Sequence, residues 1–123
     1  MKINPMAASQ SLASAPFVRV LSNANIFNGV RIRTVVFIHI DDSWEGDTRA
    51  YISHNDYENG LSFNSVSISL NRKEEYKLYK NINNKYCMIT CKSNHDKLLD
   101  VPYFTDVENI EVYSDPKKRK NRI

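Results

Sequence analysis

Apolar and polar residues alternate along several stretches of the chain, with the two-residue period of β-strands that bury one face. The clearest case is NSVSISL at 64–70, where Val66, Ile68 and Leu70 are predicted to face inward and the serines outward. The stretch VRIRTVVFIHI at 30–40 begins with the same alternation and then becomes apolar on both faces. It predicts a long strand that is exposed on one side at its start and covered on both sides later.

Three further stretches predict strands. The residues at 49–53, 86–92 and 107–113 contain β-branched and aromatic side chains and lie next to turn-forming residues. In the last of them, Ile110 and Val112 are predicted to face inward. The pattern therefore predicts five strands in all.

Helical spacing is found in one convincing place. At 72–82, Leu78 and Ile82 lie four residues apart among charged side chains, which is typical of an amphipathic helix. At 17–27 a short helix or turn is predicted, with its apolar side chains against the body of the protein. The stretch at 94–103 shows neither period and is predicted to be irregular.

The order of these elements indicates a fold class. Five strands with a helix between the third and the fourth are typical of the OB-fold, a partly open five-stranded barrel. We therefore predict a mainly β protein, a five-stranded OB-like antiparallel barrel at 17–113. A flexible segment is expected at 1–16 and a basic tail at 114–123. The length of 123 residues, with 41% apolar and 25% charged residues, suits one globular domain.

The beginning of the chain resembles a secretory signal only superficially. Ala13, Ser14 and Ala15 match a small-x-small cleavage site, but polar residues interrupt the apolar stretch that must precede it. No run of roughly 18 apolar residues is present, so no membrane-spanning helix is predicted. We expect a cytoplasmic protein.

The positive charge is concentrated in the tail. The chain has 17 basic and 14 acidic residues, of which five basic and one acidic lie at 114–123, so the rest carries 12 against 13 and a net charge of −1. That balance argues against a cationic groove for a phosphate backbone on the barrel. The tail can contact nucleic acid or a membrane surface, but a solubilising segment is the simpler interpretation. Its cations are Lys117, Lys118, Arg119, Lys120 and Arg122.

Three stretches carry a resemblance: FNGVRIRTVVFIHID, AYISHNDYENGLSFNSVSISL and NNKYCMITC. Together they resemble a set of small uncharacterised bacterial proteins with an OB-like five-stranded barrel, over roughly 17–113. The chain departs from that pattern around His39 and at Cys91, where a glycine is expected. The resemblance implies the barrel and no particular activity.

The two cysteines are predicted to be reduced core thiols. Cys87 and Cys91 lie four residues apart, which in a strand separates their α-carbons by about 13 Å, whereas a disulfide needs roughly 4.4–6.8 Å. Both side chains lie on one face of the predicted strand, together with Ile89.

No metal or cofactor site is predicted. His39, His54 and His95 lack metal-ligand spacing, which leaves only a site that the fold itself would assemble. The acidic loop at 41–47 lacks the ligand positions of a calcium loop and is interpreted as a solvated hairpin loop.

We do not expect an enzyme. No nucleophile elbow, phosphate loop or other catalytic motif is present. His54, Asp56 and Glu58 are candidates for acid–base chemistry, but such a group is common in polar loops, and a loop or single helical turn is predicted here.

The first functional hypothesis is a non-enzymatic module that binds and blocks a protein partner, in its sharpest form an immunity or inhibitor protein of a bacterial toxin. Trp44 is the predicted anchor, because tryptophan is enriched among interface hot spots, unless it folds back to cap the barrel end. The other candidate contact residues are Asp41, Asp42, Glu45, Asp47, Tyr51 and Tyr57.

The alternative is a single-stranded nucleic-acid-binding OB-fold. Phe37, Tyr51 and Tyr57 would then stack on bases, as aromatic residues on OB-fold strands do. Phosphates would meet the basic tail and three arginines of the barrel: Arg31, Arg33 and Arg49. The net charge of −1 outside the tail argues against this alternative.

Overall fold

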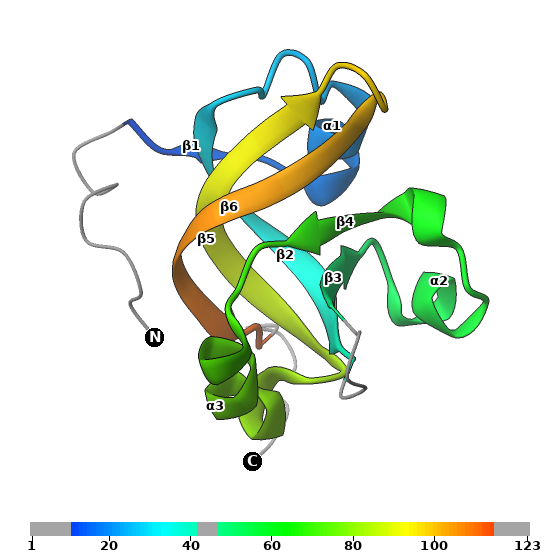
Figure 1. Ribbon diagram of the computed structural model, residues 1–123, viewed down its shortest axis with the longest axis vertical. Helices are drawn as coiled ribbons and strands as arrows, with labels where there is room; N and C mark the ends of the chain where they lie inside the picture. The colour runs from blue at the N-terminus through cyan, green and yellow to red at the C-terminus, as the bar shows by residue number, and fades with distance from the viewer. Residues whose placement is uncertain (1–10, 42–46, 115–123) are drawn as a thin grey trace.

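The computed structural model describes residues 11–41 and 47–114, which form a twisted β-barrel with short helices around it (Figure 1). The strands are β1 (Ala13–Ser14), β2 (Val30–Ile40), β3 (Thr48–Tyr51), β4 (Ser65–Ile68), β5 (Lys85–Asp96) and β6 (Val101–Val112). The helices are α1 (Phe17–Ser22), α2 (His54–Glu58), the 3₁₀ turn η2 (Ser62–Asn64) and α3 (Arg72–Ile82). The mainly β fold and the helix at 72–82 are confirmed.

Five strands close the barrel in the order β2-β3-β4-β6-β5, and β5 pairs back onto β2. Neighbours are antiparallel except β4 and β6, which are parallel through the pairs Ser67–Tyr103 and Ile68–Phe104. The prediction of an antiparallel barrel is thus wrong for one pair. Strands β2 and β4 run in the same direction, because both are antiparallel to β3. Strand β6 also runs in that direction, because β5 is antiparallel to both β2 and β6, so β6 must be parallel to β4. With α3 between the third and fourth barrel strands, the topology fits an OB-like fold.

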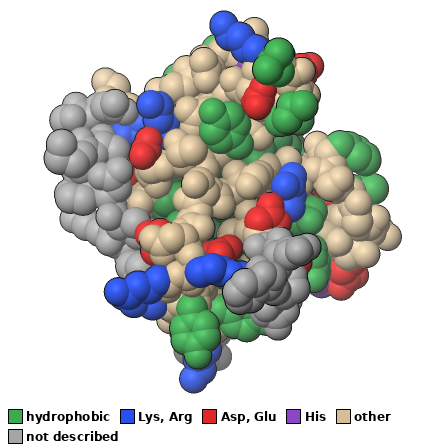
Figure 2. All heavy atoms as spheres, viewed as in Figure 1, with side chains coloured by type: hydrophobic (Ala, Val, Ile, Leu, Met, Phe, Trp, Pro, Cys, Tyr) green, Lys and Arg blue, Asp and Glu red, His purple; other side chains and the backbone are tan. Residues whose placement is uncertain are grey.

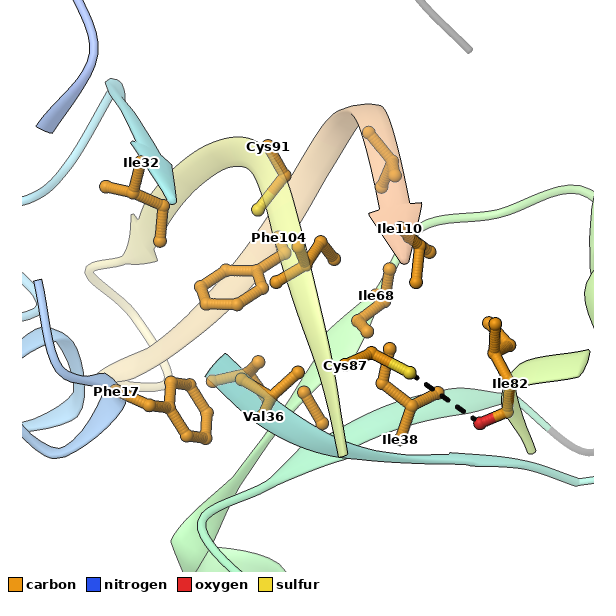
Figure 3. Packing of buried hydrophobic residues seen from close by; sticks show 14 of the residues in the cluster. Phe17, Ile32, Val36, Ile38, Ile68, Ile82, Cys87, Cys91, Phe104 and Ile110 are labelled. Carbon is orange, nitrogen blue, oxygen red and sulfur yellow. Dashed lines mark hydrogen bonds between the residues drawn. The ribbon is translucent and has the colours of Figure 1, made fainter. Parts of the chain in front are cut away.

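All five barrel strands contribute side chains to the hydrophobic core inside the barrel (Figure 3). Alternate residues of β2, among them Ile32, Val36 and Ile38, point inward as the period of two requires. Phe17 of α1 meets the ring of Phe104 edge-on, with 5.8 Å between ring centroids. Two side chains of α3, Leu78 and Ile82, are buried in the same cluster.

Helix α3 begins at a capping box. The Asn71 side chain accepts a hydrogen bond from the Glu74 N–H, and the Glu74 carboxylate accepts one from the Asn71 N–H. One turn later, the buried carboxylate of Glu75 accepts a hydrogen bond from the Thr48 hydroxyl of β3 and pairs with Arg72 at 3.5 Å. These contacts fix α3 against the barrel.

The stretch predicted to be irregular, 94–103, is a β-hairpin. Strand β5 continues to Asp96, and β6 begins at Val101. In the turn between them, one oxygen of the Asp96 carboxylate accepts hydrogen bonds from the N–H groups of Leu98 and Leu99. The prediction failed because these strands form through pairing with each other along their whole length, which local periodicity does not reveal.

Val112 was also predicted wrongly. It is exposed near the end of β6, whereas Ile110 is buried as expected. Strand β4 pairs with β6 only at Tyr103 and Phe104, so the end of β6 has a partner strand on one side alone.

The segment at 1–16, which was expected to be flexible, contributes a short strand. Ala13 and Ser14 form β1, which pairs in parallel with β2, and the Ala15 N–H donates to the Arg33 carbonyl at 3.2 Å. Within the described ranges 11–41 and 47–114, no helix is long and apolar enough to cross a membrane.

Candidate functional site

The aromatic side chains predicted to meet a partner or a base lie against one another. Phe37 of β2 and Tyr51 of β3 are buried, and Tyr57 of α2 covers both, at centroid distances of 5.7 Å and 5.5 Å. His39 stacks on Tyr57 at 4.3 Å. Helix α2 therefore completes a small aromatic cluster on the outside of the sheet, in which neither Phe37 nor Tyr51 is accessible to a ligand.

The candidate acid–base residues do not converge. The His54 Nε2 atom lies 2.9 Å from the Glu58 Oε1 atom, one turn along α2, and both side chains are exposed. The Asp56 N–H donates to the Ser53 hydroxyl that caps the helix. Asp56 thus serves the first turn of α2, and the pair formed by His54 and Glu58 lies on the exposed surface of the helix.

The arginines predicted to meet phosphates are engaged with the protein itself. Arg31 donates to both carboxylate oxygens of Glu108, at 2.5 Å and 2.7 Å, and this hydrogen bonding raises the pKa of Arg31. Arg49 donates to the Ser65 hydroxyl at 2.9 Å and lies 3.7 Å from Asp47. Arg33 is exposed and only weakly bonded, at 3.4 Å from the Thr90 hydroxyl.

The acidic loop and the tail fall largely outside the described residues. This applies to Asp42, Trp44 and Glu45 of the loop and to Lys117, Lys118, Arg119, Lys120 and Arg122 of the tail. The two ends of the loop are described: the Asp41 N–H donates to the Asp47 carbonyl at 3.1 Å, which continues the pairing of β2 with β3.

The two cysteines are free and buried, as predicted. Burial raises the pKa of the Cys87 thiol to about 11 and also raises that of Cys91. The Cys87 Sγ atom lies 3.9 Å from the carbonyl oxygen of Ile82 at the end of α3 (Figure 3). Among the described residues, no group of three or more His, Cys, Asp or Glu side chains is placed to hold a metal ion.

Several exposed apolar side chains, including the most exposed one, Leu98, lie together where sequence analysis expected only irregular chain. We call Leu98, Leu99, Val101 and Tyr103 the hairpin tip. Leu98 is 96% exposed and Leu99 72% exposed, and Val101 and Tyr103 are also exposed. The sequence offered one indication of this surface, which is the pair of leucines between the turn-forming residues Asp96 and Asp100. A turn does not require large apolar side chains, so their presence indicates an interaction surface.

The hairpin tip is held in place by specific contacts. Besides the two bonds to the Asp96 carboxylate, the Asp100 Oδ1 atom lies 2.8 Å from the His95 Nε2 atom, and Asp100 adopts a left-handed backbone with φ of 54°. The Asn28 side-chain oxygen accepts a hydrogen bond from the His95 N–H, which attaches the turn after α1 to the same end of the barrel. That turn carries the exposed Ile26.

A scan against protein-family models and a search of the curated proteins each found no match for this chain. The resemblance to small bacterial proteins therefore has its structural counterpart in the barrel alone.

Proposed function

We propose that the protein is a non-enzymatic module that binds a protein partner through the hairpin tip. The observation that carries this proposal is the exposure of Leu98 and Leu99, adjacent in sequence at the end of a two-stranded projection. Exposed apolar side chains gathered in one place mark interaction sites in soluble proteins, and burying two leucines provides a favourable term for association.

The geometry of the tip suits binding without rearrangement. The turn is fixed by the Asp96 carboxylate and by the contact between His95 and Asp100. A contact surface that is already in its bound shape loses less conformational entropy on association. This supports insertion of the two leucines into an apolar depression of a partner.

Within this class, we propose an immunity or inhibitor protein that blocks a bacterial toxin in the cytoplasm. In this proposal, the exposed leucines of the hairpin tip enter an apolar depression of the toxin. The free, buried thiols are compatible with a reducing compartment. This proposal uses the hairpin tip as the contact surface. The contact surface predicted from the sequence was the loop at 41–47, with Trp44 as its anchor, together with Tyr51 and Tyr57.

Nucleic-acid binding by the barrel face is supported less well. The stacking residues Phe37 and Tyr51 are buried beneath α2, and Arg31 is neutralised by Glu108. A base would have to displace Tyr57 before it reached either ring.

Affinity purification from cells of the source organism tests the proposal, with the full chain as bait. The doubly substituted variant Leu98→Ser/Leu99→Ser removes the apolar tip. Phe63→Ser is the matched control, because Phe63 is 77% exposed but lies on η2, away from the hairpin. We expect the wild type and the control to recover a common partner that the double variant loses.

Recovery of the same partner by the double variant at wild-type yield would contradict the proposal. If the purified partner is a toxic enzyme, the wild type and Phe63→Ser should suppress its activity, and the double variant should not. Circular dichroism checks that all three proteins fold alike.

A further inference from the structure

The outward face of α3 combines cations with exposed aromatic rings. Lys73, Tyr76, Lys77 and Lys80 follow the spacing i, i+3, i+4 and i+7, so they lie along one face of the helix. Tyr76 is 87% exposed, and Tyr79, one turn along from it, is 38% exposed. The Tyr76 ring is therefore almost fully accessible to solvent, and the Tyr79 ring is partly accessible.

The two acidic residues of α3 form hydrogen bonds within the protein. Glu74 closes the capping box with Asn71, and Glu75 is buried against Thr48. Across the described residues, Lys73, Lys77 and Lys80 form no ion pair. The face is therefore positively charged, although the barrel as a whole is nearly neutral.

This face borders a groove of about 1090 Å³ that runs between α3 and the end of β2. Tyr76, Lys77, Tyr79 and Lys80 line it on the helix side, where Arg72 and the buried Glu75 also border it. Ile40 and the acidic Asp41 line it on the strand side. Figure 2 shows basic and apolar side chains side by side at the lower end of the molecule, where Figure 1 places α3.

We propose that the α3 face binds single-stranded nucleic acid. Lys73, Lys77 and Lys80, which form no ion pair with any described residue, can neutralise phosphates. The exposed phenol rings of Tyr76 and Tyr79 offer surfaces on which bases stack. An acidic peptide would use the lysines but would give the rings no comparable partner, so the combination favours a nucleic acid. The rings of Phe37 and Tyr51, in contrast, are buried and cannot take this role.

The course of the chain adds to the same argument. The Tyr113 N–H donates to the Tyr86 carbonyl at 2.8 Å, so the described chain ends beside the start of β5, which directly follows α3. The five tail cations begin four residues after Tyr113 in the sequence. The described chain therefore ends at the same end of the barrel as the α3 face (Figure 1).

Fluorescence anisotropy with a labelled 20-nucleotide oligo(dT) tests the proposal on the full chain. Tyr76→Ala removes one stacking ring and keeps every charge, and Lys77→Gln/Lys80→Gln removes two cations and keeps both rings. The matched controls are Tyr103→Ala and Lys97→Gln, at the opposite end of the barrel. We expect about tenfold weaker binding for Tyr76→Ala, a comparable loss for the double lysine variant, and no change for the controls.

Salt dependence and one further measurement distinguish a nucleic acid from an acidic peptide on the α3 face. The logarithm of the affinity should fall linearly with the logarithm of salt concentration, by about 0.7 per phosphate neutralised, and less steeply in the double lysine variant. A labelled oligo-glutamate of the same length should bind more weakly than the oligonucleotide.

Three results would overturn the proposal. In the first, the wild type does not bind oligo(dT). In the second, oligo-glutamate binds as tightly and Tyr76→Ala has no effect, which assigns the face to an acidic protein. In the third, only a full-length variant with all five tail cations replaced by glutamine loses binding, which assigns the contact to the tail. Circular dichroism confirms that each variant is folded.

Discussion

At the scale of single residues, burial sets the chemistry of the two thiols. A thiol that remains protonated inside the barrel but ionises in the unfolded chain makes stability depend on pH. The pKa of Cys87 rises from 9.0 to about 11 on folding, and that of Cys91 rises as well. The stabilisation is therefore complete below about pH 9 and is lost as the pH rises from there toward the folded value.

We predict that the melting temperature falls more between pH 8 and pH 10.5 in the wild type than in Cys87→Ala/Cys91→Ala. Scanning calorimetry at both pH values measures the difference, and an equal fall in the two proteins would show that the thiols do not contribute. At pH 8 a disulfide reagent should modify both cysteines rapidly in guanidinium and slowly in the native protein.

A second residue-scale feature is the left-handed backbone of Asp106, with φ of 49°. Between the pairs Thr90–Asn109 and Lys92–Thr105, three residues of β6 face one residue of β5, and Asp106 is the first of the three. This bulge requires a conformation that costs a β-branched residue most and glycine least.

Replacement of Asp106 should therefore change stability in the order Gly, Asp, Val, from highest to lowest. We expect Asp106→Val to cost about 1–2 kcal/mol and Asp106→Gly to cost nothing. Urea denaturation measures both. Glu111→Val on the same strand serves as the control with an ordinary backbone, and the prediction fails if it costs as much as Asp106→Val.

At the scale of elements, burial along β6 shows where this strand stops contributing side chains to the core. Ile110 is buried, and Val112, two residues further on the same face, is exposed. An unpaired charge is far more costly in the core than at the surface. Ile110→Asp should abolish cooperative thermal unfolding, and Val112→Asp should shift the melting temperature by only a few degrees. Equal losses would place Val112 in the core after all.

Some secondary-structure elements could be predicted from the sequence and others could not. The long strand at 30–40, the helix at 72–82 and the inward face of Val66 and Ile68 were predictable, because each carries a strong local period. The hairpin around Leu98 was not, because β5 and β6 are specified by each other across the turn. The period of the last strand likewise gave no information on where its neighbour β4 ends.

The candidate sites were harder to predict for a related reason. Phe37, Tyr51 and Tyr57 were expected to be available for stacking, but the sequence does not show that α2 folds back and covers Phe37 and Tyr51 with Tyr57. Tyr76 and its lysines were visible only as a polar helix face. Their significance depends on Glu75 turning inward, which is a tertiary contact with Thr48.

At the scale of the whole molecule, the two proposed surfaces lie at opposite ends of the barrel, with the hairpin tip at one end and α3 at the other (Figure 1). Sites that are separated in this way and share no contact residue should act independently. Tyr76→Ala should leave recovery of the protein partner unchanged, and Leu98→Ser/Leu99→Ser should leave the affinity for oligo(dT) within twofold. Loss of both activities in either variant would indicate one continuous surface.

The parallel pairing of β4 with β6 has a consequence for biosynthesis. Because Phe104 of β6 is the residue that meets Ile68 of β4, a nascent chain that has exposed every strand but β6 still has an open seam and an unfilled interior. Until β6 is synthesised, the apolar side chains of β2 have no complete core in which to pack. Collapsed, aggregation-prone states compete with folding during that interval. A premature stop codon ahead of Phe104 would therefore yield a polypeptide with most of its secondary structure encoded and no stable native state.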